Sequence, residues 1–142
     1  YPNLIFLKDG ELFKIEGSQY LVLGGGYSSD YFSRMLNNEG WWPDEELSKI
    51  EWQKIIGRLE EKNQKELDLI VLSHVLPKSC AKVFTERKQT SRTEEKMDEI
   101  LERFGSSIKA WYAGHYHINE ERNMSENWKG EVKIFYDCFW KE

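Results

Sequence analysis

Apolar residues near the start of the chain form short runs broken by turn-forming residues. The runs at 4–8 and 11–16 lie on either side of Asp9-Gly10, a pair that tolerates the positive φ of a tight hairpin turn. They therefore predict a β-hairpin. Residues 20–23 predict a third short strand, which leads directly into three consecutive glycines at 24–26.

Two later segments carry the apolar spacing of amphipathic helices. The first begins at Pro43-Asp44, has acidic residues in its first turn, and is expected to run to about Lys65. Its predicted apolar face consists of Leu47, Ile50, Ile55, Ile56 and Leu59.

The second helix is expected from Ser91 or Thr93 to Phe104. Ser91 and Glu94 have the spacing of a capping box, and Gly105 suits the carboxyl end. Its apolar face is formed by Met97, Ile100, Leu101 and Phe104.

Continuous apolar runs predict the remaining strands. Residues 69–72 indicate a strand covered on both faces, residues 108–113 another, and residues 132–136 the last, with an extension toward Trp140. Residues 27–43 show no period and predict a long ordered loop. The succession predicts one domain of the α/β or layered α+β class.

The composition excludes several functional classes. The chain has 142 residues and a formal net charge of -5, and no basic block is long enough to follow a phosphate backbone. No apolar run is long enough to span a membrane. Cys80 and Cys138 have no CxxC spacing, so we expect free thiols and a cytoplasmic location. The absence of an initial Met leads us to expect a processed chain or a fragment.

All three histidines follow predicted strands. His74 ends the run DLIVLSH, and His115 and His117 follow Gly114 in WYAGHYH. Ligands of open α/β sheets bind at the carboxyl ends of strands, and neutral imidazole is the commonest protein ligand of transition metals. The pattern therefore indicates a metal site, although each histidine could equally be an ordinary polar residue at a strand end.

The loop from residue 27 to 43 contains the other candidate binding residues. The glycines before it could cradle a phosphate, but neither a P-loop nor GxGxxG is present, which favours a simple tight turn. Trp41 or Trp42 could stack on a base or sugar, and packing against the helix start is the competing interpretation. We place Ser28, Asp30 and Arg34 beside a substrate, with a salt-bridged Arg34 as the alternative.

The order of these motifs resembles the calcineurin-like metallophosphoesterase family. The residues that carry the resemblance are SHVLP at 73–77 and GHYH at 114–117, each after a strand, with a helix between them. The segment LVLGGGYSSD, followed by Arg34 and WWPDEE, is similar to one in bacterial and phage members. Nearly the whole chain takes part, and the match is to the C-terminal half of that domain.

The resemblance implies a four-layer α/β/β/α sandwich with two divalent transition metals at the strand ends. His74 and His115 would ligate one metal and His117 the other. Such a pair activates a hydroxide that attacks a phosphate mono- or diester, and Mn, Fe, Zn, Ni and Co all suit these ligands. The loop at 27–43 would then influence substrate specificity.

The chain also departs from the family pattern. It contains no DxH, GDxxD or GNH motif, which supply the carboxylates and the catalytic histidine. We therefore expect an N-terminal half to be missing, and the isolated chain to be inactive and to hold metal weakly or not at all. Apolar sheet surface should be left uncovered, which favours self-association.

Two other functions fit the same residues. The chain could be a non-catalytic binding scaffold in which the metal site of this fold has decayed. It could also be a hydrolase with one zinc held by His74, His115 and His117.

Overall fold

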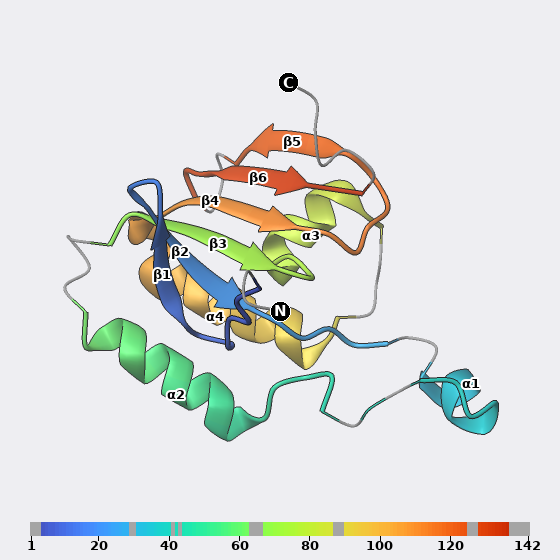
Figure 1. Ribbon diagram of the computed structural model, residues 1–142. Coiled ribbons are helices and arrows are strands. Elements are labelled where there is room, and N and C mark those ends of the chain that lie inside the picture. The colour runs from blue at the N-terminus through green and yellow to red at the C-terminus, as the bar shows by residue number, and fades with distance from the viewer. Residues whose placement is uncertain are drawn as a thin grey trace.

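The structure, a computed structural model, describes residues 4–28, 31–40, 42, 44–62, 67–86, 90–124 and 128–136 (Figure 1). These residues form one six-stranded sheet with the strand order β1-β2-β3-β4-β6-β5. Its strands are β1 (Leu12–Ile15), β2 (Ser18–Leu23), β3 (Leu69–Ser73), β4 (Ile108–Ala113), β5 (Glu120–Asn123) and β6 (Glu131–Ile134). The four central strands are parallel, while β1 and β5 run antiparallel at the two edges. The α/β class is confirmed.

The described residues also form four helices. They are α1 (Tyr31–Leu36), α2 (Lys49–Glu60), α3 (Lys78–Phe84) and α4 (Arg92–Phe104). Figure 1 shows α2, α3 and α4 on one side of the sheet, and α1 beyond the carboxyl ends of the parallel strands. Because these strands all point the same way, the loops after β2, β3, β4 and β6 meet at one end of the sheet, where the parallel strands finish.

The main core lies between the sheet and the three helices. Leu21, Val71, Trp111 and Val132 are aligned across the four parallel strands, and all of them are fully buried. Trp52 and Ile55 of α2 and Phe104 of α4 belong to the same cluster. Burying each such side chain contributes about 1.5–3 kcal/mol, so this face accounts for most of the hydrophobic stabilisation.

The other face of the sheet also bears apolar side chains, but no described helix covers it. Side chains alternate between the faces of a strand, so this face contains the row Phe13, Tyr20, Ile70, Ala110 and the row Val22, Leu72, Tyr112. None of them belongs to the core cluster, and all except Ile70 and Ala110 are only half-buried. We call these seven residues the open face.

The predicted hairpin around Asp9-Gly10 is wrong. The observed hairpin joins β1 to β2 through Glu16-Gly17, both of which have positive φ. The turn at Asp9-Gly10 exists, but Gly10 donates its N–H to Val22, so this segment pairs with β2. Residues 4–8 form no strand. Strand β1 pairs with β2 and not with residues 4–8. The reason is that Leu21 and Leu23 of β2 reach the core, whereas the apolar side chains of residues 4–7 are exposed.

The first predicted helix begins later than expected. Helix α2 starts after Ser48, whose side chain accepts a hydrogen bond from the N–H of Glu51 in a complete capping box. That box satisfies two N–H groups at the helix start, which Pro43-Asp44 cannot do. Ile50 is exposed and Trp52 is buried, so the predicted apolar face was partly wrong. The predicted end at Lys65 falls outside the described residues, and α2 ends at Glu60.

The second predicted helix is confirmed as α4. Ser91 and Glu94 form the expected capping box, and the four predicted apolar residues are buried. Gly105 follows the helix as expected, in a right-handed conformation that continues into a short 3₁₀ turn.

The remaining strands were predicted more closely than the connections. Strand β4 has the predicted bounds, β3 extends one residue further, and β6 spans residues 131–134 in place of 132–136. Its proposed extension toward Trp140 lies outside the described residues. Helices α1 and α3 and strand β5 were not predicted, because each is too short to show a clear period. Among the helices that the structure describes, none is long and apolar enough to cross a bilayer.

Candidate functional site

The carboxyl ends of the parallel strands surround a cleft of about 1100 Å³. Its lining comes from the loops after β2, β3, β4 and β6, from α1, and from the segments between α1 and α2 and after α3. The residues are Gly25, Gly26, Tyr27, Ser28, Arg34, Glu45, His74, Thr85, His115, Tyr116, His117, Phe135 and Tyr136. All three histidines and two of the three residues predicted beside a substrate are therefore in one cleft.

His74 and His115 lie side by side in this cleft. Ser73 pairs with Ala113 across β3 and β4, so the residues that follow leave the sheet together. His115 Nδ1 is 3.0 Å from His74 Nε2, and the rings meet edge to face. With metal–nitrogen bonds of about 2.1 Å, two ligands at a right angle place their nitrogens about 3.0 Å apart. The same distance also suits an imidazole–imidazole hydrogen bond, in which one ring donates its N–H to the other.

The backbone of the GHYH motif is strained. His115 has φ 67° and His117 has φ 55°, the left-handed conformation that favours glycine. Each such residue costs about 1–3 kcal/mol relative to ordinary backbone, and such strain is concentrated at functional sites. With Tyr116 in between, the conformation directs both histidines into the cleft while the intervening side chain packs against the core.

Hydrogen bonds hold the loops after β3 and β4 together. Gly114 donates its N–H to the carbonyl oxygen of His74, and Leu76 donates its N–H to the hydroxyl oxygen of Tyr116. Below them, the indole N–H of Trp111 donates to Ser73 Oγ over 2.7 Å. His74 and His115 are thus positioned by main-chain bonds as well as by their own contact, so the pair is preorganised.

Two of the three consecutive glycines are needed for this arrangement. Gly25 has φ 88°, which a larger residue adopts only with strain. A Cβ on Gly26 would lie 2.9 Å from Cδ2 of His74, so only glycine lets this loop pass so close to the imidazole. The structure therefore explains these glycines by the tight backbone conformation and the close approach to His74. Phosphate binding by the same glycines stays a prediction.

The titration of two groups limits their chemistry. Partial burial lowers the pKa of His74, which keeps its imidazole neutral and able to ligate a metal at neutral pH. Burial raises the pKa of the Cys80 thiol to about 12, so the thiolate needed for nucleophilic attack does not form.

His117 lies in the cleft without joining the histidine pair. Its ring stacks on Tyr136 at a centroid distance of 4.6 Å, with an interplanar angle of 19°. Within the described part of the chain, no group of three or more His, Cys, Asp or Glu side chains is placed to hold a metal ion. The structure therefore brings two imidazole nitrogens together, and the third imidazole lies in the same cleft, stacked on Tyr136.

The predicted substrate-adjacent residues have different outcomes. Ser28 lines the cleft and donates its hydroxyl to Glu45 Oε2 over 2.5 Å. Arg34 lines the cleft from α1 and donates to the carbonyl oxygen of Gly40 over 3.4 Å. Asp30 lies outside the described residues, as do Trp41 and Cys138.

Sequence reasoning missed three cleft residues. Tyr116 was not predicted although it separates the two histidines, and Tyr136 was not because residues 132–136 were predicted as strand, whereas β6 ends at Ile134. Glu45 lies in WWPDEE, where its role as a hydrogen-bond partner of Ser28 depends on a contact 17 positions away. Of these residues, Tyr116 had a signal in the sequence, since it stands between two histidines directly after a predicted strand.

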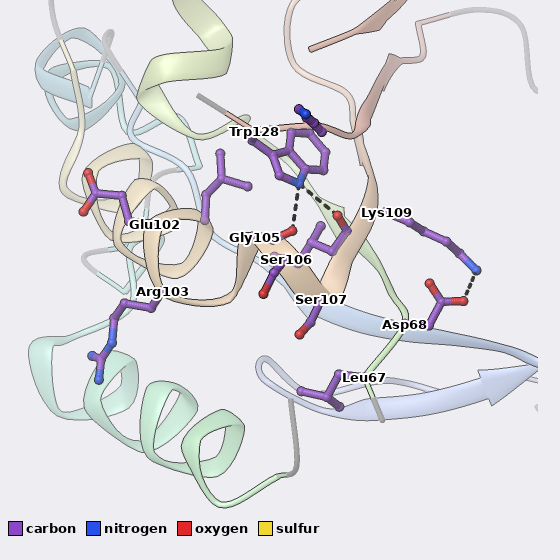
Figure 2. A pocket seen from close by; sticks show the side chains of 12 residues that line it. Leu67, Asp68, Glu102, Arg103, Gly105, Ser106, Ser107, Lys109 and Trp128 are labelled. Carbon is purple, nitrogen blue, oxygen red and sulfur yellow. Dashed lines mark hydrogen bonds and ion pairs between the residues drawn. The ribbon is translucent and has the colours of Figure 1, made fainter. Parts of the chain in front are cut away.

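A second cavity, of about 600 Å³, lies at the opposite end of the parallel strands (Figure 2). Its walls include Asp68, Lys109 and Trp128, and Figure 2 shows the ion pair between the first two. Trp128 donates its indole N–H to the carbonyl oxygens of Gly105 and Ile108. Neither a histidine nor a residue with positive φ lines this cavity, so the candidate site is the histidine cleft.

Comparison of the chain with models of known protein families and with characterised proteins gave no match. The geometry of the histidine cleft and the order of the motifs around it remain as the basis for a function.

Proposed function

We propose that this chain supplies the histidine end of a metal-dependent phosphoesterase centre of the calcineurin-like type, acting on phosphate mono- or diesters. The observation that carries the proposal is the apposition of His74 and His115 at the carboxyl edge, on strained and hydrogen-bonded loops. Fold stability does not explain this arrangement of the two histidines. Both rings are solvent-accessible, and the left-handed backbone at His115 is itself destabilising.

In this proposal His74 and His115 hold one divalent ion through the two facing nitrogens. His117 serves the second ion, as the resemblance implies. Ions of this kind act as Lewis acids toward phosphoryl oxygens and lower the pKa of water. Mn, Fe, Zn, Ni and Co all suit a site of mixed imidazole and carboxylate ligands. The guanidinium of Arg34 supplies positive charge to a phosphate in the same cleft.

Two imidazoles do not complete such a centre. The sequence has no DxH, GDxxD or GNH motif, so we propose that carboxylate ligands come from a polypeptide segment outside these residues. The second sheet of a four-layer sandwich would pack on the open face, whose half-buried aromatic and aliphatic side chains resemble half of a sheet–sheet interface. Without that partner, a second copy of the chain would cover the same surface.

Sedimentation velocity can test the role of the open face. We expect the chain to self-associate in the micromolar range, and Tyr20→Glu to shift it toward monomer because a buried charge disfavours the interface. Gln53→Glu adds the same charge at an exposed position of α2, on the side of the sheet opposite to the open face, and serves as the control. Identical sedimentation of the Tyr20→Glu variant and the unchanged chain would rule out this surface.

A non-catalytic scaffold is the second candidate. It is favoured by one observation, namely that the described residues contain no cluster of three metal-ligating side chains. A single zinc ion held by all three histidines is less well supported, because His117 stacks on Tyr136 and does not join the pair of His74 and His115.

Titration with Co²⁺ distinguishes these functions, because its absorption spectrum reports imidazole ligation. We expect one weakly bound Co²⁺ per chain, lost in His74→Ala and in His115→Ala and retained in Lys129→Ala at the opposite end of the sheet. Equal uptake by His74→Ala, His115→Ala and the unchanged chain would refute the metal site, and no uptake at all would favour the scaffold. One tightly bound ion that also requires His117 would point to the three-histidine zinc site.

Activity measurements complete the test. With Mn²⁺, the chain alone should not hydrolyse p-nitrophenyl phosphate or bis-p-nitrophenyl phosphate, because the carboxylate ligands are missing. Turnover that disappears in His117→Ala would show instead that these residues form a complete enzyme.

A further inference from the structure

A smaller cavity opens beside the histidine cleft. It has a volume of about 210 Å³ and shares Gly26, Tyr27, Ser28 and Glu45 with the cleft. The two cavities are therefore adjacent, and a molecule bound at the histidines can extend into the smaller one. Pockets that hold whole drug-sized ligands measure roughly 300–1,000 Å³, so this one suits a single compact group.

The walls of this cavity are largely aromatic. Tyr27 and Tyr31 lie with ring centroids 6.0 Å apart and tilted by 54°. Trp42 lines the cavity and is 62% exposed, although tryptophan is usually well buried. An indole ring that is excluded from the core, and that faces a cavity with two tyrosines, presents a ready stacking surface.

Polar groups lie at the other side of the same cavity. Arg92 and Glu46 both line it, with Arg92 Nη2 3.9 Å from Glu46 Oε2. Glu46 Oε1 accepts hydrogen bonds from the N–H and the hydroxyl of Thr93, which fixes the carboxylate at the start of α4. The cavity thus combines flat apolar walls with a positioned guanidinium and carboxylate, which can pair with the polar edge of a planar ring.

We propose that this cavity binds the planar aromatic group of a phosphoester, a nucleobase or an aryl ring, while the phosphate lies among the histidines. The inference extends the proposed phosphoesterase function by naming the class of its substrate. Stacking on Trp42 and the tyrosines supplies affinity, because every base or aryl ring has a face that can stack. The shared residues Gly26 to Ser28 connect the two parts of the site.

Isothermal titration of the chain with adenosine 5′-monophosphate, adenosine, phenyl phosphate and ribose 5-phosphate tests the proposal. We expect the three aromatic compounds to bind more tightly than ribose 5-phosphate. Trp42→Ala should weaken adenosine binding by about tenfold, the order of magnitude of one lost stacking contact. Phe6→Ala removes an aromatic residue that is 85% exposed and lines none of these cavities, so it should change nothing. A preference for adenosine 5′-monophosphate over phenyl phosphate would identify the base as the ligand, and equal affinity would identify any aryl ring.

The proposal is overturned if ribose 5-phosphate binds as tightly as adenosine 5′-monophosphate, or if Trp42→Ala leaves adenosine binding unchanged. Co²⁺ uptake by the Trp42→Ala variant separates this failure from that of the phosphoesterase function. Normal uptake without aromatic binding removes only the aromatic site. Aromatic binding that depends on Trp42, in a chain that takes up no metal, keeps the site and removes the phosphoesterase function.

Discussion

The two ends of the parallel strands differ in backbone conformation and in the side chains that line their cavities. At the carboxyl end, His115 and His117 adopt left-handed backbone and His74 Nε2 lies 3.0 Å from His115 Nδ1. At the amino end, Trp128 closes a cavity of comparable kind with ordinary backbone and with its indole N–H shared between two carbonyl oxygens. Both ends have cavities, but among the described residues only the cavity at the carboxyl end is lined by non-glycine residues with positive φ and by facing imidazoles.

The difference shows how a site can be separated from a structural cavity. The place of Trp128 at the amino end is explained by folding, because its side chain is buried and its indole N–H is hydrogen-bonded. At the carboxyl end, two histidines adopt costly left-handed backbone, and their rings line the cleft.

Trp128→Ala should have the largest effect on stability. Trp128 is 6% exposed and contacts Gly105 and Gly130, so its removal leaves a cavity and two carbonyl oxygens without their donor. We expect a loss of about 3–5 kcal/mol in the free energy of unfolding, measured with urea. The Co²⁺ affinity of the protein that remains folded should be unchanged. A Co²⁺ affinity that fell together with the free energy of unfolding would mean that the two ends are coupled.

Gly26→Ala should disturb the carboxyl end. The added Cβ would lie 2.9 Å from the His74 ring, and relieving that contact should cost about 1–3 kcal/mol and weaken Co²⁺ binding. Gly57→Ala is the matched control, because nothing lies within 4 Å of a Cβ there and Gly57 is inside α2. That control should instead stabilise the protein, by up to about 1 kcal/mol. Urea unfolding and Co²⁺ titration of both variants provide the comparison, which fails if Gly26→Ala behaves like the control.

Tyr116→Phe should lower the free energy of unfolding by less than the two preceding substitutions, and it should also lower the Co²⁺ affinity of the histidine cleft. It removes the oxygen that accepts the N–H of Leu76, at a cost of about 1–2 kcal/mol. Because this bond joins the loops that carry His74 and His115, Co²⁺ affinity should fall as well. In Tyr112→Phe the lost hydroxyl has no hydrogen bond to any described residue, and both quantities should stay nearly constant. Equal Co²⁺ affinities in the two variants would contradict the proposed positioning role of Tyr116.

Cys80 should stay unreactive although it lies in α3, six positions after His74 in the sequence. Because burial raises the pKa of its thiol to about 12, the thiol remains protonated at pH 8 and the nucleophilic thiolate is scarce. We expect no alkylation by iodoacetamide in the folded protein and rapid alkylation in 6 M guanidinium, with the Cys80 peptide followed by mass spectrometry. Rapid labelling of the folded chain would show that this part of the carboxyl end opens to solvent.

Local patterns identified the elements whose stability is local. Helix α4 was predicted with its capping box because Ser91 and Glu94 are three residues apart, and β4 because its apolar run is continuous. The start of α2 had the same kind of signal in Ser48 and Glu51, which the acidic run before it obscured. The first hairpin could not be predicted, because residues 4–8 and 18–23 are both apolar and only the second run packs against the core.

The sequence by itself determined that all three histidines follow strands, since a glycine and two buried apolar runs mark those positions. Only the tertiary structure decided that His74 faces His115 while His117 stacks on Tyr136. That choice depends on the parallel register of Ser73 with Ala113 and on the φ angles after Gly114. Both arise from contacts between segments about 40 residues apart, which no local pattern of residues can encode.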